Sequence, residues 1–325
     1  PSPKPTPAPA PSPKPTATVT PVPQPLTMIK TVTVAPDENL KIPGAFCRIN
    51  YVPVTDNFLV TFGGTAHGTQ GYGYKWYTQD LEFTGEWGLF QERGTDTASV
   101  MVDNTYYFLT NGGKNMWSLK KFDPITWTLQ EQTLIKRNPN KEFGNDPMLV
   151  YVNGMLDVSG LYTADGQGSL DQKKTNPRKG ETTHHRFFTN NLEFLEYRVF
   201  SDTPHINGSS MVYVDGVYNM VTSTAFFGNL IVMRYDKDWN YLGSKILAQG
   251  GNWSMGIAYN EEQGHFYVTY LDDPPRSLTN VRLAIFDTDW NSIANIAVTQ
   301  YADHSFSQTG RPWVILHNHH VYVSF

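Results

Sequence analysis

The stretches Tyr235-Asp-Lys-Asp-Trp239-Asn and Phe286-Asp-Thr-Asp-Trp290-Asn decide the fold of this chain. In each, an apolar strand ends in an aromatic residue, a polar turn follows, and a second aromatic residue opens the next strand. Looser copies begin at Tyr77, Phe122 and Phe188. A four-stranded propeller blade takes about 40–50 residues, and the second aromatics are 44, 67, 45 and 51 residues apart. They are Phe83, Trp127, Phe194, Trp239 and Trp290.

An apolar hairpin precedes each of these units, most plainly around Asn153-Gly154 and Asp215-Gly216. These dipeptides favour two-residue turns because both central positions need a positive φ. Similar strand pairs lie at 47–62, 99–110, 256–270 and 312–325, which gives six inner hairpins and five outer pairs. The sequence therefore predicts an all-β fold, a β-propeller of six blades made of four-stranded antiparallel sheets.

The last blade lacks outer strands in this reading. The alternating segment Met28–Ala35 is expected to supply one of them and to close the ring together with the C-terminal strands. The blade would then have three strands, and the N-terminal arm of a neighbouring chain is a candidate for the fourth. Five blades, with the last hairpin as an addition, is the alternative.

Residues 1–26 are predicted to form a proline-rich arm or linker ahead of a propeller at 27–325. Eleven of the 22 prolines lie within residues 1–25, and proline favours an extended polyproline II conformation without internal hydrogen bonds. The arm is either a stiff spacer to an anchor or a contact to another subunit. Its hydroxyl residues are candidates for O-glycosylation, chiefly Thr6, Ser12, Thr16 and Thr18.

The amino-acid composition and charge indicate which partners and which location to expect. Charged residues make up 17% of the chain and aromatic residues 14%, and the net charge is −5. Without a basic run, nucleic acid is not an expected partner, and no apolar run is long enough to predict a membrane-spanning helix. Cys47 is the only cysteine, so no intrachain disulfide can form. A start at Pro1 without an initiator Met is expected of a processed, mature chain or of a shortened sequence. The protein is expected to be secreted, extracellular or at the cell surface.

The segment Phe143-Gly-Asn-Asp146-Pro-Met-Leu-Val-Tyr-Val-Asn-Gly154 resembles part of the family 43-type glycoside hydrolases and their five-bladed arabinanase relatives. The resemblance implies an aspartate base, a pKa-tuning aspartate and a glutamate acid around the central channel. Asp146 matches the tuning aspartate, and Asp96 is a second candidate carboxylate. The base and acid positions instead read Arg48-Ile-Asn and His205-Ile-Asn-Gly-Ser, so the catalytic set is incomplete.

Other candidate sites are spread over several blades. The sequons at Asn207 and Asn252 fall at nearly the same point of consecutive blades and are candidate N-glycosylation sites. Residues near the expected channel or in the loop Gly63–Tyr74 are candidates for ligand binding. They are Tyr72, Tyr74, Trp253 and Arg311. No cofactor is expected. His317 and His319 would need further ligands to hold a metal, so they are interpreted as turn residues.

Two functions remain open from the sequence. The first is a non-catalytic extracellular propeller glycoprotein, a structural or adhesive building block that self-assembles into a homo-oligomer or filament, or is anchored, through its proline-rich arm. The second is a carbohydrate-active propeller that binds glycans or hydrolyses them. In the first the chain is not an enzyme, and in the second it is a glycoside hydrolase or a glycan-binding protein.

Overall fold

The computed structural model describes residues 26–32, 34, 40–41, 47–66, 69–90, 98–111, 116–136, 145–162, 182–200, 206–224, 228–272, 280–299 and 311–325. All regular structure in these residues is β-strand. The described part holds no helix long and apolar enough to cross a membrane. The chain divides into two units, 1–31 and 32–325, of which the second carries the strands.

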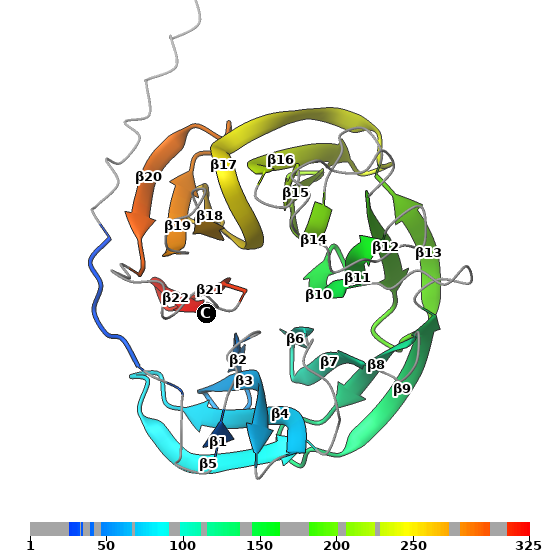
Figure 1. Ribbon diagram of the computed structural model, residues 1–325, viewed down its shortest axis with the longest axis vertical. Coiled ribbons are helices and arrows are strands. Elements are labelled where there is room, and N and C mark those ends of the chain that lie inside the picture. The colour runs from blue at the N-terminus through cyan, green and yellow to red at the C-terminus, as the bar shows by residue number, and fades with distance from the viewer. Residues whose placement is uncertain are drawn as a thin grey trace, which may run out of the picture. The chain divides into compact units, whose positions relative to one another are not determined.

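Five four-stranded antiparallel blades are arranged in a ring (Figure 1). The first blade is β2 (Arg48–Val52), β3 (Asn57–Ala66), β4 (Thr69–Tyr77) and β5 (Phe83–Phe90), with β1 (Leu40–Lys41) added to the far end of β3. The second is β6 (Ala98–Val102), β7 (Thr105–Asn111), β8 (Met116–Phe122) and β9 (Leu129–Lys136). The third is β10 (Asn145–Val152), β11 (Met155–Tyr162), β12 (Thr182–Phe188) and β13 (Phe194–Val199).

The fourth and fifth blades share one strand. The fourth is β14 (Ile206–Val214), β15 (Val217–Ser223), β16 (Gly228–Asp236) and the first part of β17 (Tyr241–Asn260). The fifth is the remainder of β17 with β18 (His265–Asp272), β19 (Asn280–Phe286) and β20 (Ser292–Ala297). The all-β propeller fold predicted from the sequence is confirmed.

The predicted inner hairpins are confirmed at their turns. Asn153 and Gly154 have φ of 48° and 79°, and Val152 pairs with Met155 across that turn. The Asp215-Gly216 turn has the same form. The predicted loop Gly63–Tyr74 is different, because β3 and β4 run through it as a continuous ladder to Ala66 and Thr69.

The outer turns also follow one pattern, which places an apolar residue in the left-handed region. Trp239 and Trp290 have φ of 65° and 63°, and the preceding aspartates, Asp236 and Asp287, accept backbone hydrogen bonds within the turn. These short polar side chains stabilise such turns by mimicking a backbone bond.

The equivalent left-handed residues in the other blades are Leu81, Trp127 and Leu192. The alignment of Phe83 and Phe194 with the tryptophans was therefore wrong by two residues. Both phenylalanines lie on outer strands, 47% and 58% exposed.

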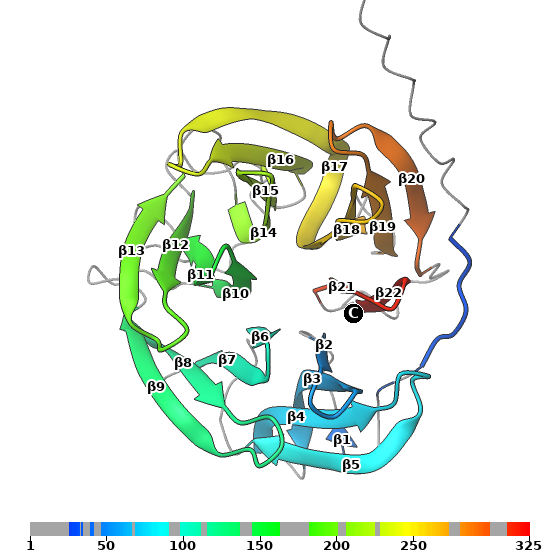
Figure 2. The same ribbon diagram turned by 180° about the vertical axis from the view of Figure 1, so that it is seen from behind.

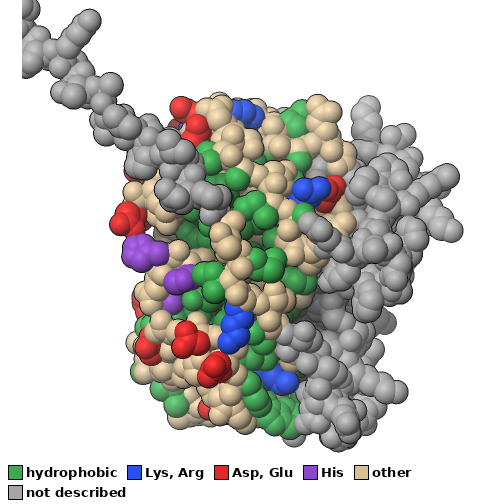
Figure 3. All heavy atoms as spheres, turned by 90° about the vertical axis from the view of Figure 1, so that its left-hand side faces the viewer, with side chains coloured by type: hydrophobic (Ala, Val, Ile, Leu, Met, Phe, Trp, Pro, Cys, Tyr) green, Lys and Arg blue, Asp and Glu red, His purple; other side chains and the backbone are tan. Residues whose placement is uncertain are grey.

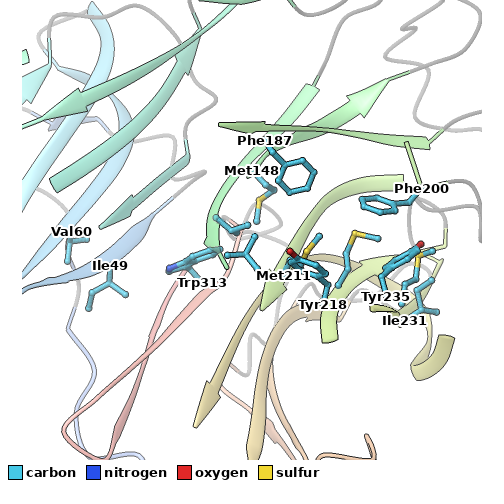
Figure 4. Packing of buried hydrophobic residues seen from close by; sticks show 14 of the residues in the cluster. Ile49, Val60, Met148, Phe187, Phe200, Met211, Tyr218, Ile231, Tyr235 and Trp313 are labelled. Atoms are coloured by element: carbon cyan, nitrogen blue, oxygen red, sulfur yellow. The ribbon is translucent and has the colours of Figure 1, made fainter. Parts of the chain in front are cut away.

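The tryptophans Trp239 and Trp290 pack between adjacent blades. Trp239 stacks on Tyr218 with ring centroids 3.9 Å apart and also meets Phe200 of the preceding blade. Trp290 stacks on Phe266, and its indole N–H donates across the blade boundary to Asn219 Oδ1 at 3.2 Å. Figure 4 shows the buried cluster to which the first, third and fourth blades and the C-terminal hairpin all contribute.

The C-terminal hairpin, β21 (Trp313–His317) and β22 (His320–Ser324), is a separate two-stranded sheet. Both ribbon views place it between β2 on one side and the fifth blade on the other (Figures 1 and 2). The structure thus shows five complete blades plus this hairpin, which is the alternative arrangement, and a complete sixth blade is not shown. The expected strand at Met28–Ala35 was wrong, since residues 26–32 and 34 form no strand.

Close packing on both faces fixes this hairpin in the ring. Trp313 and Tyr322 join the cluster of Figure 4, which includes Phe58 of the first blade, whereas Val314 joins the cluster of the fifth blade. Gly256 on β17 permits this approach, because a Cβ there would lie 3.2 Å from the backbone of β21, at Trp313 Cα.

Candidate functional site

The carboxylates expected from the glycosidase resemblance are only partly described. Asp146 lies near the start of β10, the innermost strand of the third blade, but its side chain lies outside the described parts. Asp96 also lies outside them.

The glycosylation candidates are placed only through their backbones. Asn207 lies at the start of β14, and Asn252 lies in β17 opposite Asp272. The side chains of Asn207, Asn252 and Trp253 lie outside the description, as do the arm residues Thr6, Ser12, Thr16 and Thr18.

The other ligand candidates are core residues in this structure. Tyr72 is fully buried and meets Phe108 edge-on, so its ring has no face open to a ligand. Tyr74 is half-buried and packs on Trp127. Arg311 is only 6% exposed. The structure brings none of these three together in an open site.

A buried polar relay lies between the third and fourth blades instead. Asp157 Oδ2 is 2.8 Å from His185 Nδ1, and His185 Nε2 is 3.1 Å from Ser209 Oγ. The residues come from β11, β12 and the inner strand β14. Phe200 contacts the imidazole with ring centroids 4.9 Å apart and close to perpendicular.

The atoms of this relay follow the order of a Ser-His-Asp triad, in which the carboxylate orients the imidazole and the imidazole faces the hydroxyl. All three residues are 0% exposed, however. Ser209 has no path to a substrate in this state, so the arrangement serves as a polar tie between two blades. A second tie lies beside it, where Ser159 Oγ donates to the carbonyl of Ser209 at 3.4 Å.

Sequence reasoning missed this relay. Asp157 carries the one visible signal, since it is a charged residue inside the otherwise apolar strand Met155–Val158. Such a residue usually has a partner when it is buried. The partner could not be read from the sequence, because His185 and Ser209 lie 28 and 52 positions further on.

A second polar cluster centres on Arg48, the first residue of β2. Its Nη1 donates to the carbonyl of Arg311 at 3.0 Å, and its Nη2 lies 3.3 Å from Met148 Sδ on β10. The guanidinium also sits 4.6 Å from the ring centroid of Trp313. Arg48 therefore joins the inner strands of the first and third blades to the C-terminal hairpin.

Burial dominates the electrostatics of this cluster. Arg48 is 1% exposed, and burial lowers its pKa to about 10, although the neighbouring Cys47 acts in the opposite direction. Burial likewise raises the pKa of the half-buried Cys47 thiol to about 11. The guanidinium remains charged and the thiol protonated at neutral pH, which suits neither group to nucleophilic or proton-transfer chemistry.

The two hairpin histidines considered as metal ligands contact an aromatic ring and a carboxylate. His317 stacks on Tyr51 with ring centroids 3.6 Å apart, and the exposed His319 lies 3.3 Å from Glu262. Among the described residues no group of three or more His, Cys, Asp or Glu side chains is placed to hold a metal ion.

The chain matches no protein-family model and no curated protein. Its fold is similar to that of a Trypanosoma rangeli sialidase solved with the inhibitor DANA, with a TM-score of 0.55 and 11% identity over 87% of this chain and 52% of that one. It is also similar to a subtype N10 neuraminidase-like protein of A/little yellow-shouldered bat/Guatemala. The TM-score is 0.52, and the identity is 9% over 84% of this chain and 87% of that one.

The family 43 protein BlXynB of Bacillus licheniformis is a more distant neighbour, with a TM-score of 0.47 and 11% identity over 67% of this chain and 45% of that one. The sialidase and the neuraminidase-like protein, with TM-scores above 0.5, share the propeller fold with this chain. The chain is an all-β propeller of five four-stranded blades, with a further hairpin between the last blade and the first.

Proposed function

We propose that this protein is a non-catalytic, extracellular propeller glycoprotein that serves as a structural or adhesive building block. In this proposal it self-assembles, or is anchored, through its proline-rich arm. The described polar clusters support a non-catalytic role because the relay at His185 and the cluster at Arg48 are enclosed and contact other parts of the fold.

The observation that carries the assembly proposal is the apolar outer surface of the blades. On β5, Phe83, Trp87 and Leu89 are 47%, 41% and 41% exposed. The outer strands β13 and β17 repeat the pattern, with Phe194 58% and Leu242 52% exposed. Rows of exposed large apolar side chains mark interaction surfaces in soluble proteins.

Electron microscopy and sedimentation velocity of the purified protein test this proposal. The full chain should form oligomers or filaments whose size grows with concentration, and a chain without residues 1–26 should form smaller species. Monodisperse single rings at every concentration would sink the assembly proposal. Mass spectrometry of the secreted protein tests for glycans at Asn207 and Asn252.

A carbohydrate-active propeller is the second candidate, favoured by the resemblance around Asp146 and by sialidase among the fold neighbours. Arabinan, xylan and sialoside hydrolysis, together with a glycan array, tests it. Activity that disappears in Asp146→Asn and Asp96→Asn would establish the enzyme. An array without binding and assays without turnover would remove this candidate.

A further inference from the structure

The C-terminal hairpin has one strand edge that no described strand covers. Its turn, Asn318-His319, has both φ values positive, and His317 pairs with His320 across it. In a two-residue hairpin the flanking pair exchanges both hydrogen bonds, and pairing then alternates along the ladder. The backbone groups of Val321 and Val323 therefore point away from β21. Among the described residues nothing pairs with them.

We propose that the proline-rich arm, residues 1–25, of a second copy of this chain binds this edge of β22 as an added strand. The inference rests on the proposed assembly through the arm and names the surface that receives it. Exposed strand edges recruit extended segments in this way, with main-chain hydrogen bonds supplying much of the affinity.

The proline spacing of the arm suits a strand with a single neighbour. Prolines occupy every odd position from Pro1 to Pro15, so the residues that keep an N–H are the even ones. In an extended strand alternate residues direct their N–H and C=O groups to the same side. Over residues 1–16, one side of the arm therefore presents a continuous row of N–H donors, and the residues directed to the other side are all proline and have no N–H. Such a strand can cover an edge, and no further strand can add to it.

The receiving edge is fixed in position before any partner arrives. Tyr322 packs on Phe58 of the first blade with ring centroids 4.4 Å apart, and Val321 and Val323 join the cluster of the fifth blade. Ser324 Oγ donates to the carbonyl of Cys47 at 3.0 Å. A strand held on both faces loses little conformational entropy on binding, which favours association.

The opposite net charges of the arm and of the rest of the chain also favour binding of the arm. The arm carries Lys4 and Lys14 and no acidic residue, which leaves −7 on the other 300 residues once these two charges are taken from the chain's −5.

Acidic groups surround the hairpin. Asp80 raises the pKa of Tyr322, although less than burial does, Asp56 acts on His317, and Glu262 lies 3.3 Å from His319. Figure 3 shows acidic side chains beside the histidines on this side of the molecule.

The length of the arm suits a bridge between copies. Twenty-five residues in polyproline II span roughly 75–80 Å, whereas a body of about 290 residues has a radius of gyration of about 19 Å. Pairing with the five residues of β22 uses only about 17 Å of that span. The remainder is long enough to reach across to another propeller.

Paired substitutions on β22 test the acceptor edge in the full chain. Val321→Pro and Val323→Pro remove one outward N–H each, and neither N–H belongs to the β21 ladder. Val321→Thr and Val323→Thr are the controls, because they keep the N–H and nearly the same shape. Each proline should weaken association in sedimentation velocity by roughly fivefold, the worth of about one hydrogen bond, and each threonine should leave it unchanged.

Paired substitutions in the arm test the donor. Thr6→Pro, Ala8→Pro, Ala10→Pro and Ser12→Pro made together remove every donor of the pairing side between residues 5 and 13, and should weaken association by tenfold or more. Pro5→Ala combined with Pro11→Ala restores donors only on the outer side and should leave the affinity for β22 intact. Equal association of the two arm variants would overturn the inference.

Cross-linking identifies the occupant even where a proline variant fails to fold. A benzophenone attached to His320→Cys, on a Cys47→Ser background, is activated in a mixture with ¹⁵N-labelled wild-type chain. Labelled peptides from residues 1–25 support the proposal. Cross-links to residues 26–35 of the same chain, or to neither segment, overturn it. Wild-type protein that stays monomeric refutes the proposed self-assembly, whereas assembly that is unchanged by every β22 substitution refutes only this docking surface.

Discussion

Replacing His185 by Phe should destabilise the propeller far more than its small change in shape suggests. The substitution keeps an aromatic ring against Phe200, so little or no cavity forms. It removes the 2.8 Å contact to Asp157 and the 3.1 Å contact to Ser209. Asp157 is 0% exposed, and its Oδ1 already has no hydrogen-bond partner among the described residues. The variant would therefore bury an unpaired carboxylate.

The expected cost is about 1–3 kcal/mol, the usual penalty of leaving a buried polar group without its hydrogen-bond partner. Urea unfolding followed by tryptophan fluorescence, with linear extrapolation to water, measures it. The triple variant Asp157→Leu, His185→Phe, Ser209→Ala should recover most of the loss, because apolar groups need no partner. His317→Phe is the control, since it retains the stack on Tyr51 and should cost less than about 1 kcal/mol. A loss below about 1 kcal/mol in His185→Phe would refute the tie between the blades.

Further substitutions test the packing between blades and the pH dependence of stability. Gly160→Ala should cost about 1–3 kcal/mol in urea unfolding, because its Cβ would collide with the ring of Trp117; an unchanged midpoint would contradict this contact. Trp290→Phe should cost about 1–3 kcal/mol, because Asn219 Oδ1 loses its indole donor, and Asn219→Ala made in addition should add little. Burial holds the pKa of His317 below its ordinary value, with Asp56 opposing. Its stabilising contribution is thus present above the ordinary histidine pKa of about 6.5 and is lost as the pH falls through its lower pKa in the folded state. His317→Phe should flatten thermal midpoints between pH 7 and 5, and parallel curves would exclude the effect.

The repeating parts of this fold could be predicted from the sequence because local chemistry determines them. Asn153-Gly154 selects a two-residue turn through its backbone preferences alone. The Asp236 turn is equally local, since its carboxylate bonds only residues up to Asn240. In the first blade, Phe83 was aligned with the tryptophans because it is aromatic. The residue that is equivalent in the structure is Leu81, two positions earlier. The turn selects the residue at positive φ, and in that blade the residue is leucine.

The parts that depend on distant contacts could not be predicted. The relay joins Asp157 to His185 and Ser209 across two blades, and no local pattern links these positions. The absence of a strand at Met28–Ala35 is similar in kind. Its alternating residues favour a strand, but the described residues 26–32 and 34 form no backbone ladder, and the side chains of Val32 and Val34 pack against the core while partly buried. Burial of apolar side chains can satisfy such a pattern outside a sheet.

The shared strand β17 has a consequence for how the molecule comes apart. Its 20 residues serve first as the outer strand of one blade and then as the inner strand of the next, without an intervening loop. A polypeptide that belongs to two sheets cannot leave one and remain in the other unchanged. Under mechanical load or in hydrogen exchange, the fourth and fifth blades should therefore open together as one cooperative unit.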